Sequence, residues 1–389
     1  MSKSDFPFNI DDIALNLLGL RTQKGFPSAT VSHYRVLCPF CTSSHYSLDI
    51  VRDRNIWSCQ ACGNTGGMLD LYKKVKYGEM TSMTNGEAYK EIVEQLNCET
   101  YAPVYKKTEV SYAKESDTKG TKERHKVYSE MKKLPYFMLA EKHRLNLLNR
   151  GLTSAQIKAN GYFSSPSKQF DFLVASELIK KGYNLEGIPG FYLDDGTRYN
   201  QLKKNYSEIP GYRDGEQNWA FKSWPSGFYI PIRNEYGMIV SIQTRTENSK
   251  CKYIFLSSAD MSLGSKAVSC AHYAGNFVDR PTKVYLTEGP LKADIAHGLS
   301  GEAFIALPGV NNYTAMKDVL LTLKKIGVKT IASAFDMDCF TNPQVAKAVK
   351  NHKQLIIEAG FSYEFCRWDE RFKGIDDYLL FKTKERDHE

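Results

Sequence analysis

Short apolar runs alternate with longer stretches of helical periodicity in the C-terminal part of the chain. Val284–Thr287 and Thr330–Phe335 have the length and composition of buried strands. Apolar residues recur at helical spacing between and after these runs, in Leu291–Leu299, Tyr313–Ile326 and Gln344–Ala359. Because strands that alternate with helices of this length form parallel sheets, the C-terminal part is predicted to be an α/β domain.

The rest of the chain shows strands that follow one another directly. Tyr46–Val51 and Asn55–Ser58 alternate as a hairpin, and Gly227–Arg233 with Met238–Arg245 predicts a second hairpin. The helices predicted in these regions are Asn9–Leu20, Asn85–Leu96 and a helix for which Thr153 is a candidate N-cap. The predicted fold class is therefore multidomain α/β.

Carboxylates follow the two predicted strands of the C-terminal part. Glu288 comes directly after the first strand, Asp336 and Asp338 come after the second, and Asp376 lies further on. In a parallel sheet, the loops at the carboxyl ends of the strands carry the site. Asp336 and Asp338 stand two positions apart at a strand end, so both side chains are expected to point the same way. Gly289 allows a sharp turn from Glu288 into the next helix.

Several acids at one edge of a sheet repel one another unless cations hold them, and Mg²⁺ takes such oxygen ligands. We therefore expect Mg²⁺ or Mn²⁺, two ions in a complete site, bound by Glu288, Asp336 and Asp338. Asp376 is expected to assist, and the chemistry expected is phosphoryl transfer. The alternative is that these residues are ordinary surface acids that cap strand ends.

Four of the nine cysteines form two closely spaced pairs. Cys38 and Cys41 are separated by seventeen residues from Cys59 and Cys62, a spacing typical of a zinc ribbon that holds one structural Zn²⁺. Gly63 eases the second turn. The alternatives are a redox Cys-x-x-Cys pair and four buried thiols without metal.

The hairpin between the cysteine pairs carries basic, aromatic and amide side chains. Groups of these kinds suit contact with a DNA backbone, base stacking and reading of base edges. An ordinary solvated hairpin would carry much the same set, so both interpretations stay open. The candidates for template recognition are Arg52, Arg54, Trp57 and Gln60.

Charge and cysteine usage narrow the classes of partner and compartment. The net charge of the 389 residues is +8, from 52 basic and 44 acidic residues, and residues 101–150 hold twelve Lys/Arg against six Asp/Glu. Such a local surplus favours a polyanionic partner. Nine cysteines without a secretion signal, and no long apolar run, indicate a reducing cytoplasm and no membrane partner.

The acidic motifs resemble those of a Toprim domain, which bacterial-type primases, topoisomerases and some nucleases share. The resemblance depends on Glu288-Gly289 after a strand, Asp336-x-Asp338 after a later strand and a further Gly-x-Asp ending at Asp376. Ala306–Gly309, between the two main motifs, is similar to the Toprim segment of phage primases.

One position departs from this family pattern. Primases usually have an Asp four residues after the glutamate, and this chain has Lys292 there. Asp294 lies two residues further on, and the sequence leaves open which of the two residues takes the place of the family Asp.

The upstream regions resemble other parts of the same enzymes. The cysteine region is similar to the N-terminal zinc domain of primases. Bacterial versions generally have His as the second ligand, whereas this chain has Cys41 there and so looks more like phage and mobile-element versions. Val127–Asn276 resembles the basic half of the primase polymerase core, which implies that its basic residues hold template and nucleotide phosphates. The residues implied are Arg233, Arg245, Lys250, Lys252, Tyr253 and Lys266, with Lys292 as a further phosphate contact. For each basic residue, the alternative is an ordinary solvated strand face.

Taken together, the order of these regions implies a DNA primase of phage or mobile-element type. The implied domains are a zinc-ribbon DNA-binding domain (1–98), a flexible charged linker (99–126), the mixed α+β basic N-terminal half of the RNA polymerase core (127–280) and a parallel-sheet Toprim catalytic domain (281–389). Its implied partners are single-stranded DNA, ribonucleoside triphosphates and a separate replicative helicase, in the cytosol of the host.

Rival interpretations stay open at the level of sequence. A Toprim nuclease would not need the basic region, and a topoisomerase would need a tyrosine nucleophile in a further domain, beyond Asp377. A non-catalytic zinc-ribbon DNA-binding replication factor with a decayed Toprim site is also compatible with the sequence, because Lys292 replaces an expected acid.

Overall fold

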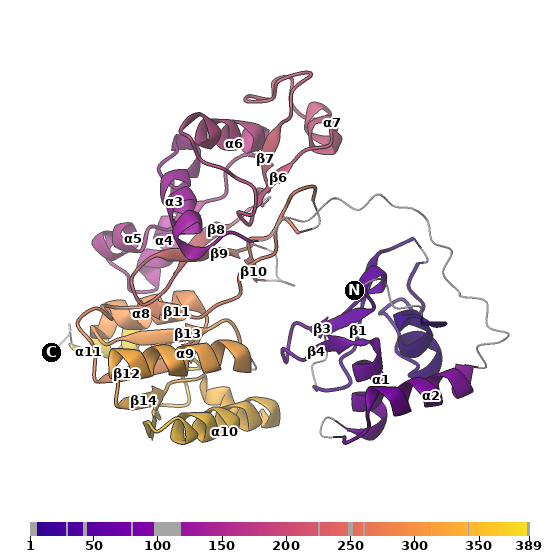
Figure 1. Cartoon of the computed structure of the whole chain (residues 1–389). Helices are drawn as coiled ribbons and strands as arrows, with labels where there is room; N and C mark the ends of the chain where they lie inside the picture. The colour runs from indigo at the N-terminus through magenta and orange to yellow at the C-terminus, as the bar shows by residue number, and fades with distance from the viewer. Residues whose placement is uncertain are drawn as a thin grey trace. The chain divides into compact units, whose positions relative to one another are not determined.

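The structure is a computed structural model of the whole chain. It describes residues 6–28, 30–41, 45–78, 81–96, 118–224, 226–247, 252–259, 261–310, 312–340 and 342–386. These residues form two compact units with several sheets, one mainly within residues 6–96 and one mainly within residues 118–386 (Figure 1). No helix in the described ranges has the length and apolar character needed to cross a membrane.

An antiparallel sheet in the order β1-β2-β3-β4 is the centre of the first unit. Its strands are β1 (His33–Val36), β2 (Leu48–Val51), β3 (Ile56–Cys59) and β4 (Thr65–Gly67). Residues Leu48–Val51 pair with Ile56–Cys59, which confirms the first predicted hairpin. The 3₁₀ turn η2 (Arg52–Arg54) joins these two strands.

Three helical segments pack with this sheet in one core: η1 (Asp12–Leu17), α1 (Met68–Tyr77) and α2 (Asn85–Leu96). α2 has the bounds predicted from its apolar spacing. The helix predicted at Asn9–Leu20 is shorter than expected and is π-helical over Asp12–Leu17. Trp57 and Tyr72 are among the largest fully buried side chains of the unit.

Part of the segment predicted as a flexible linker is helical. α3 spans Thr121–Met131, so the assignment of residues 121–126 to the linker is wrong. Arg124 is buried and donates hydrogen bonds to the carbonyl of Lys119 (2.7 Å) and the hydroxyl of Thr121 (3.1 Å). The first turns of α3 are rich in charged residues, and that composition hid the helix in the sequence. Residues 99–117 lie outside the described residues.

In the second unit, an antiparallel sheet in the order β10-β9-β8-β5 comes first. Its strands are β5 (Phe163–Ser164), β8 (Phe228–Arg233), β9 (Ile239–Arg245) and β10 (Tyr253–Phe255). β8 and β9 pair directly, which confirms the second predicted hairpin. Nearly all residues of both strands are buried, so both faces of this sheet are covered.

Helices cover the two faces of the antiparallel sheet. α3 and α6 (Asp171–Lys180) pack on one face, and α4 (Glu141–Asn149) and α5 (Ser154–Asn160) pack on the other. The predicted cap of α5 is confirmed, because Thr153 Oγ1 accepts a hydrogen bond from the Gln156 amide at 3.2 Å. The remaining elements of this region are η3 (Pro135–Phe137), η4 (Lys168–Phe170), β6 (Phe191–Leu193), α7 (Thr197–Lys203) and β7 (Trp219–Phe221).

A five-stranded sheet in the order β11-β13-β12-β14-β15 completes the second unit. Its strands are β11 (His272–Ala274), β12 (Lys283–Glu288), β13 (Phe304–Leu307), β14 (Thr330–Ser333) and β15 (Ser362–Phe365). The predicted parallel sheet is confirmed for β12 to β15. β11 runs antiparallel to β13 at the edge, which the sequence pattern did not indicate.

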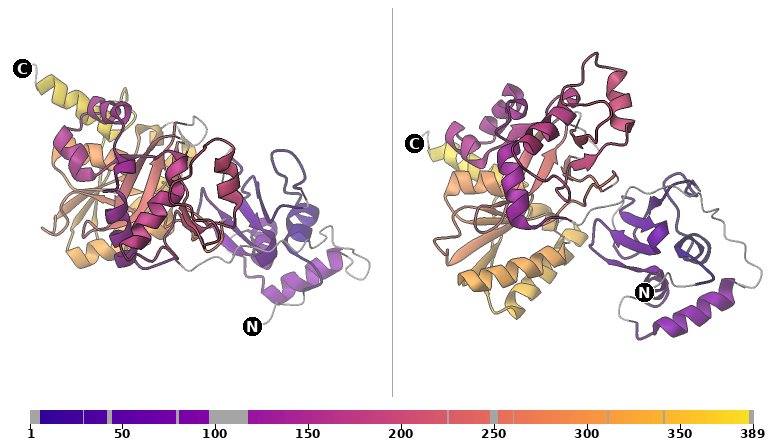
Figure 2. Two further views of the ribbon diagram at one scale, coloured as in Figure 1. Left: turned by 90° about the horizontal axis from the view of Figure 1, so that it is seen from above. Right: turned by 45° about the horizontal axis from the view of Figure 1, so that its top comes forward.

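Helices lie on both faces of this sheet and make three layers (Figure 2). α9 (Tyr313–Ile326) and α10 (Pro343–Glu358) pack on the face that carries Val284 and Leu286. α8 (Pro290–Ser300) and α11 (Ile375–Arg386) pack on the face that carries Phe304 and Ala306. The short 3₁₀ turn η5 (Met337–Phe340) follows β14. The alternation of residues along each strand therefore separates the two helical layers.

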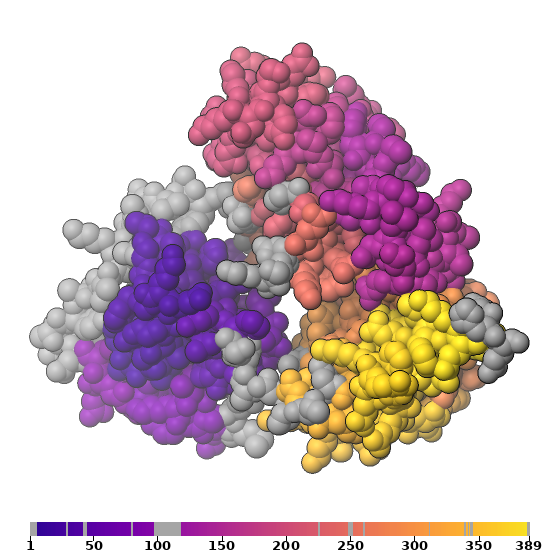
Figure 3. All heavy atoms as spheres, turned by 180° about the vertical axis from the view of Figure 1, so that it is seen from behind, coloured from indigo at the N-terminus to yellow at the C-terminus, as the bar shows by residue number. Residues whose placement is uncertain are grey.

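The antiparallel sheet and the five-stranded sheet are joined by a shared core. Leu291 and Ile295 of α8 belong to the same buried cluster as Phe228 and Ile230 of β8. A Cβ on Gly151 would stand 2.9 Å from Leu299, and Leu380 lies closer still. Figure 3 shows the yellow C-terminal residues lying against residues near position 150.

A buried hydrogen-bond network crosses this shared core. Asp294 accepts from the Tyr162 hydroxyl at 2.6 Å, and its other oxygen lies 2.8 Å from His272 Nε2. His272 Nδ1 accepts from the Arg233 amide at 3.1 Å, so Nε2 carries the proton and donates to Asp294. Burial, reinforced by the Asp294 carboxylate, raises the pKa of Tyr162 well above its ordinary value. The phenol therefore stays protonated and remains a donor.

We expect Tyr162→Phe to destabilise the chain, because it removes a donor from a buried carboxylate. The expected loss in the free energy of unfolding is about 1–3 kcal/mol, measured by urea denaturation. Tyr236→Phe is the matched control, since this ring is 69% exposed. It should change stability by less than ~0.5 kcal/mol. Equal stability of Tyr162→Phe and the wild type would contradict the importance of the network.

Candidate functional site

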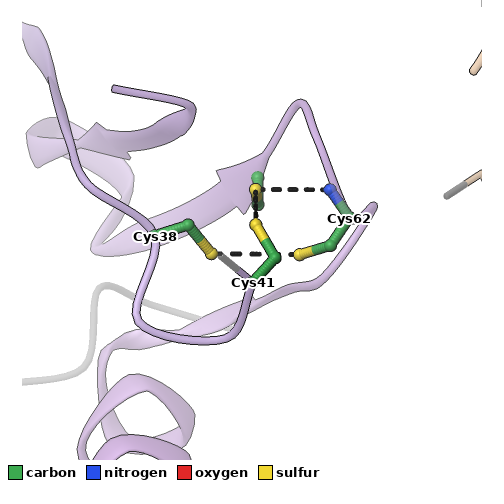
Figure 4. A group of neighbouring side chains, drawn as sticks. Cys38, Cys41 and Cys62 are labelled. Carbon is green, nitrogen blue, oxygen red and sulfur yellow. Dashed lines mark hydrogen bonds between the residues drawn. The ribbon is translucent and has the colours of Figure 1, made fainter. Parts of the chain in front are cut away.

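Four cysteines of the first unit come together at one end of its sheet. Cys38 follows β1, Cys59 ends β3, and Cys41 and Cys62 lie on the two turns. Their sulfur atoms all lie within 4.8 Å of one another. Figure 4 shows Cys38, Cys41 and Cys62 with their sulfurs turned toward one another. Gly63, on the second turn, has a φ of +73°, as a tight turn at this place requires.

Backbone amides donate hydrogen bonds to two of the four cysteine sulfurs. The amides of Ala61 and Cys62 each donate to Cys59 Sγ at 3.4 Å, and the Phe40 amide donates to Cys38 Sγ at 3.4 Å. Hydrogen bonds from the Cys38 and Cys62 thiols hold the pKa of Cys59 well below its usual range, whereas hydrogen bonding to Cys59 raises the pKa of Cys38. Four sulfur donors in a cluster of this size fit a tetrahedral Zn²⁺. The predicted zinc site is therefore supported by the geometry of its ligands.

Two of the four side chains predicted to recognise the template are structural instead. Trp57 is 1% exposed, stacks on Phe40 at 4.9 Å between ring centroids, and donates to the Gly67 carbonyl at 3.0 Å. Arg52 is ion-paired with Asp11 at 2.7 Å, and its side chain is 7% exposed. The stacking and backbone-contact roles predicted for these two residues are therefore wrong. Arg54 and Gln60 are exposed and stay candidates.

The predicted acids gather at the carboxyl edge of the five-stranded sheet. Glu288 is the last residue of β12, and Asp336 follows the parallel neighbour β14. Asp376 lies in the first turn of α11. The Met337 amide donates to the Lys373 carbonyl at 2.9 Å, so the loop before α11 is fixed to the end of β14. Gly289 makes the predicted turn into α8 with a φ of +80°.

Asp338 differs from its predicted setting. It lies in the 3₁₀ turn η5 and not on an extended strand end, so the alternation argument that paired it with Asp336 is wrong. The side chain of Asp338 lies outside the described residues.

Cationic side chains from the protein itself meet the acids at this edge. Asp336 is 5% exposed, forms an ion pair with Lys292, and has Lys373 Nζ at 3.8 Å from its other oxygen. Asp376 is 2% exposed and pairs with Arg150 at 2.6 Å. The mutual repulsion expected among these carboxylates is therefore relieved, in part, by protein cations.

Asp294 has a different place from Lys292. Both of its oxygens are occupied in the buried network with Tyr162 and His272. Lys292, by contrast, contacts Asp336 at the carboxyl edge. The position that usually carries an acid in primases is therefore held by a lysine, and Asp294 does not replace that acid at the edge.

The expected magnesium site is only partly supported by these positions. Carboxylate oxygens are the ligands that Mg²⁺ prefers. However, within the described ranges, the cysteine cluster is the only group of three or more His, Cys, Asp or Glu close enough to hold a metal ion. Glu288, Asp336 and Asp376 thus do not surround one common point. The donor type fits Mg²⁺, whereas the described carboxylates do not build a site for two ions.

A basic pocket of about 400 Å³ opens on the antiparallel sheet. Arg245 donates to Asn146 at 2.6 Å, and its guanidinium lies 5.8 Å from the centre of the Phe228 ring. Lys142 pairs with Glu247 at 2.5 Å. The residues that line the pocket are Lys142, His143, Asn146, Gly227, Phe228, Arg245, Thr246, Glu247 and Lys252. An aromatic ring among three cations suits a nucleotide base beside its phosphates.

The pocket and the acidic edge are connected through α4. Asn146 lines the pocket, and Arg150, four residues later at the C-cap of α4, pairs with Asp376. This spacing is roughly 6 Å along a helix. Lys252 lines the pocket, and Tyr253, the next residue along the chain, interacts electrostatically with Arg150. Although burial opposes it, Asp376 and Tyr253 raise the pKa of Arg150.

The remaining predicted basic residues lie elsewhere. The guanidinium of Arg233 donates to the Asn160 carbonyl, and Lys266 is exposed. Neither lines the pocket. Lys250 lies outside the described residues. The structure therefore brings together Arg245 and Lys252 of the predicted set.

Sequence reasoning missed Arg150, Lys142 and His143. Arg150 and Lys142 entered only as part of the positive surplus in residues 101–150. The sequence signal that could have found them is their place on one helix. Lys142 of α4 lines the basic pocket, and Arg150 at the C-cap of α4 pairs with Asp376 at the acidic edge. The partner of Arg150 was hidden, because Asp376 is 226 positions away.

Residues 276–386 match a family model described as a domain of unknown function (DUF3854). A comparison with curated protein sequences found no match.

The structural neighbours include bacterial primase domains. The zinc-binding and RNA polymerase domains of the Aquifex aeolicus primase are 16% identical, with a TM-score of 0.47 over 98% of this chain and 82% of that chain. The RNA polymerase domain of Mycobacterium tuberculosis primase DnaG, in complex with double-stranded DNA, is 14% identical, with a TM-score of 0.46 over 69% and 80%. Values this low leave function to be argued from this chain's own residues.

We expect the purified protein to contain one zinc per chain, measured by elemental analysis. Cys59→Ser and Cys62→Ser should each lower the zinc content by at least ~10-fold, because each removes one of four ligands. Cys366→Ser is the control, since Cys366 lies outside the cluster in the second unit and should leave zinc unchanged. Full zinc retention in both cluster variants would show that these thiols are not the ligands.

Proposed function

We propose that this protein is a DNA primase that synthesises short RNA primers on single-stranded DNA, in the replication of a phage or mobile element. Three features support the proposal: a four-cysteine cluster in the first unit, a basic pocket on the antiparallel sheet, and carboxylates at the edge of a parallel sheet. Their order along the chain is that of the primase motifs in the sequence. The reaction would join ribonucleoside triphosphates by nucleotidyl transfer.

The observation that carries the proposal is that α4 joins the basic pocket to the acidic edge. α4 provides Lys142 and Asn146 to the pocket and ends at Arg150, which pairs with Asp376. Polymerisation needs a polyanion to be held beside carboxylates that act on its reacting end. A nucleotide phosphate in the pocket would be held by Lys142, Arg245 and Lys252.

The acidic edge is proposed to take a divalent ion. Glu288, Asp336 and Asp338 would hold Mg²⁺ or Mn²⁺, and a bound ion would supply charge neutralisation at the reacting phosphate. Asp376 is proposed to act by holding Arg150 at the acidic edge, since its carboxylate already pairs with that guanidinium. Arg150 would then stabilise negative charge that develops on the phosphate.

The first unit is proposed to engage the template. With Trp57 and Arg52 buried, Arg54 and Gln60 are the exposed candidates of the hairpin. Zinc would hold the two turns that carry the cysteines and so fix the shape of this end of the sheet. A separate replicative helicase is the proposed partner in the cell.

A second function has one observation in its favour. Lys292 contacts Asp336 at the place where an acid is expected, which also suits a non-catalytic DNA-binding replication factor. Incubation with single-stranded DNA, ribonucleoside triphosphates and Mg²⁺ or Mn²⁺ separates the two functions. Labelled RNA of short, discrete lengths supports the primase, DNA binding without product supports the binding factor, and shortened DNA indicates a nuclease.

We expect Asp336→Asn and Glu288→Gln each to lower the rate of primer synthesis by at least ~10²-fold, because each removes a negative charge from the reacting edge. Single-stranded DNA binding should change little. Glu288→Gln should also leave the thermal unfolding curve nearly unchanged, whereas Asp336→Asn should unfold at a lower temperature, because it removes the partner of Lys292 from a buried ion pair. Asp279→Asn is the control, since this exposed acid precedes β12 and should leave synthesis unchanged. Synthesis at the wild-type rate in Asp336→Asn would rule out the acidic edge as the site.

Binding of single-stranded DNA should weaken with salt, because basic side chains release counterions from the phosphates. Arg245→Ala and Lys252→Ala should each lower the slope of log affinity against log salt by ~0.7. Lys180→Ala is the matched control, since Lys180 is exposed on α6 and does not line the pocket. An unchanged slope in both pocket variants would mean that DNA binds elsewhere.

A further inference from the structure

A small groove opens between α10 and β15, the edge strand of the five-stranded sheet. Its volume is about 220 Å³. Tyr363 and Phe365 line it from the face of β15 that α10 covers, and Phe340 lines it from η5. Ala346, Val349 and two lysines of α10 complete the lining. This groove, which we call the β15 groove, shares no residue with the basic pocket.

Two aromatic rings of the β15 groove are open to solvent. Phe340 is 51% exposed and Phe365 is 38% exposed, although both side chains are large and apolar. Their ring centroids lie 5.7 Å apart in an edge-to-face arrangement, so each ring helps to fix the orientation of the other. Neighbouring apolar side chains that stay exposed together are typical of a surface that binds a partner.

Cations accompany these rings. Lys350 and Lys353 line the groove from one side of α10, and Lys353 Nζ lies 5.4 Å from the centre of the Tyr363 ring. The guanidinium of Arg367 lies 5.1 Å from the centre of the Phe340 ring. Aromatic faces and positive charges therefore lie side by side around one groove.

Carboxylates are kept out of the β15 groove. Glu364 stands between the two aromatic residues of β15, so alternation turns it to the opposite face of the sheet, where it pairs with Lys283 at 2.5 Å. Glu370 pairs with Arg367 at 2.8 Å, but both side chains are well exposed, so water screens this pair. No Asp or Glu in the described part of the chain lines the groove. The positive lining favours an anionic partner.

The dimensions of the groove favour a flat ring over a peptide. Its volume is below the ~300 Å³ at which pockets for drug-sized ligands begin, so it admits one small planar group. β15 is four residues long, and so short an edge offers little backbone for a partner strand. Single-stranded nucleic acids bind to surfaces of this kind, because their bases stack on aromatic rings while their phosphates contact cations.

The β15 groove is built on the same strand end as the acids. Phe365 is paired with Ser333, the last residue of β14. Phe340 is the last residue of the 3₁₀ turn that follows β14. Asp336 lies between these two positions in the chain. The groove therefore belongs to the carboxyl edge of the five-stranded sheet.

We propose that the β15 groove binds single-stranded DNA, with a base stacked on Phe340 or Phe365 and the neighbouring phosphates in contact with Lys350 and Lys353. This site is a second DNA contact, separate from the basic pocket. The inference rests on the proposed function only for the choice of DNA over RNA. The lining agrees with that choice, since it has no carboxylate or amide side chain to accept a hydrogen bond from a 2′-hydroxyl.

The first test locates DNA on the full-length, zinc-loaded chain. An oligodeoxythymidine that contains 5-bromodeoxyuridine is irradiated in the complex, and the cross-linked residues are identified by mass spectrometry. We expect cross-links at the aromatic residues of the β15 groove. Phe340→Leu and Phe365→Leu keep an apolar side chain but remove the ring face. Each should reduce these cross-links and weaken binding of the oligonucleotide by at least ~5-fold, because a stacking contact is lost.

The control for the aromatic variants is Tyr236→Leu. This ring is 69% exposed but lies outside the groove, so cross-links and affinity should stay at the wild-type level. Lys350→Ala and Lys353→Ala should each lower the slope of log affinity against log salt by ~0.7. Lys347→Ala, exposed on α10 outside the groove, should leave the slope unchanged. Circular dichroism verifies that every variant is folded.

Wild-type affinity and wild-type cross-links in both leucine variants would overturn the proposal. Tighter binding of RNA than of DNA of the same sequence, lost in the same variants, would overturn the choice of DNA. An acidic peptide that displaces the DNA and binds Phe340→Leu as tightly as the wild type would identify a protein partner instead.

Primer synthesis by the wild type is measured separately. Cross-links in the β15 groove without any primer synthesis would support this DNA site and reject the primase function. Primer synthesis without cross-links in the groove would support the primase function and reject the site.

Discussion

The ion pair between Lys292 and Asp336 is the interaction on which the carboxyl edge of the five-stranded sheet depends. Parallel pairing of β12 and β14 places Glu288 and Asp336 at the same edge, and burial of acids there is unfavourable without counter-charge. The first turn of α8 provides that charge, and α4 provides a second cation through Arg150. The edge is thus assembled from four elements that must be in place together.

Much of the fold follows from the apolar pattern of the sequence. α2 and α9 have the bounds that their spacing predicts, and both hairpins and the parallel strands are present. Burial of apolar surface decides these elements locally, so a single sequence contains the necessary information. The cysteine pairs could also be predicted from the sequence, because a metal site imposes a short and regular spacing on its ligands.

Long-range pairing of charges accounts for most of what the sequence could not show. Arg52 and Trp57 look like residues that contact DNA, but Asp11 and Phe40 bury them. In the sequence, Lys292 looks like the loss of a functional acid, whereas in the structure it forms an ion pair with Asp336. A residue type indicates what a side chain is able to do, whereas its partner depends on segments far away in the chain. The 3₁₀ turn after β14 is a local feature that alternation along a strand does not predict.

The shared core of the second unit limits how its two halves can be separated by recombination. Apolar side chains of α8 fill the same cluster as those of β8, and Asp294 of α8 is hydrogen-bonded to Tyr162. Residues on both sides of position 280 therefore complete one interior. A gene fragment that ends there would leave apolar surface in water and a tyrosine without its acceptor. Recombination is thus expected to transfer the two halves of the second unit together, so that the acids and the basic pocket are inherited as one piece.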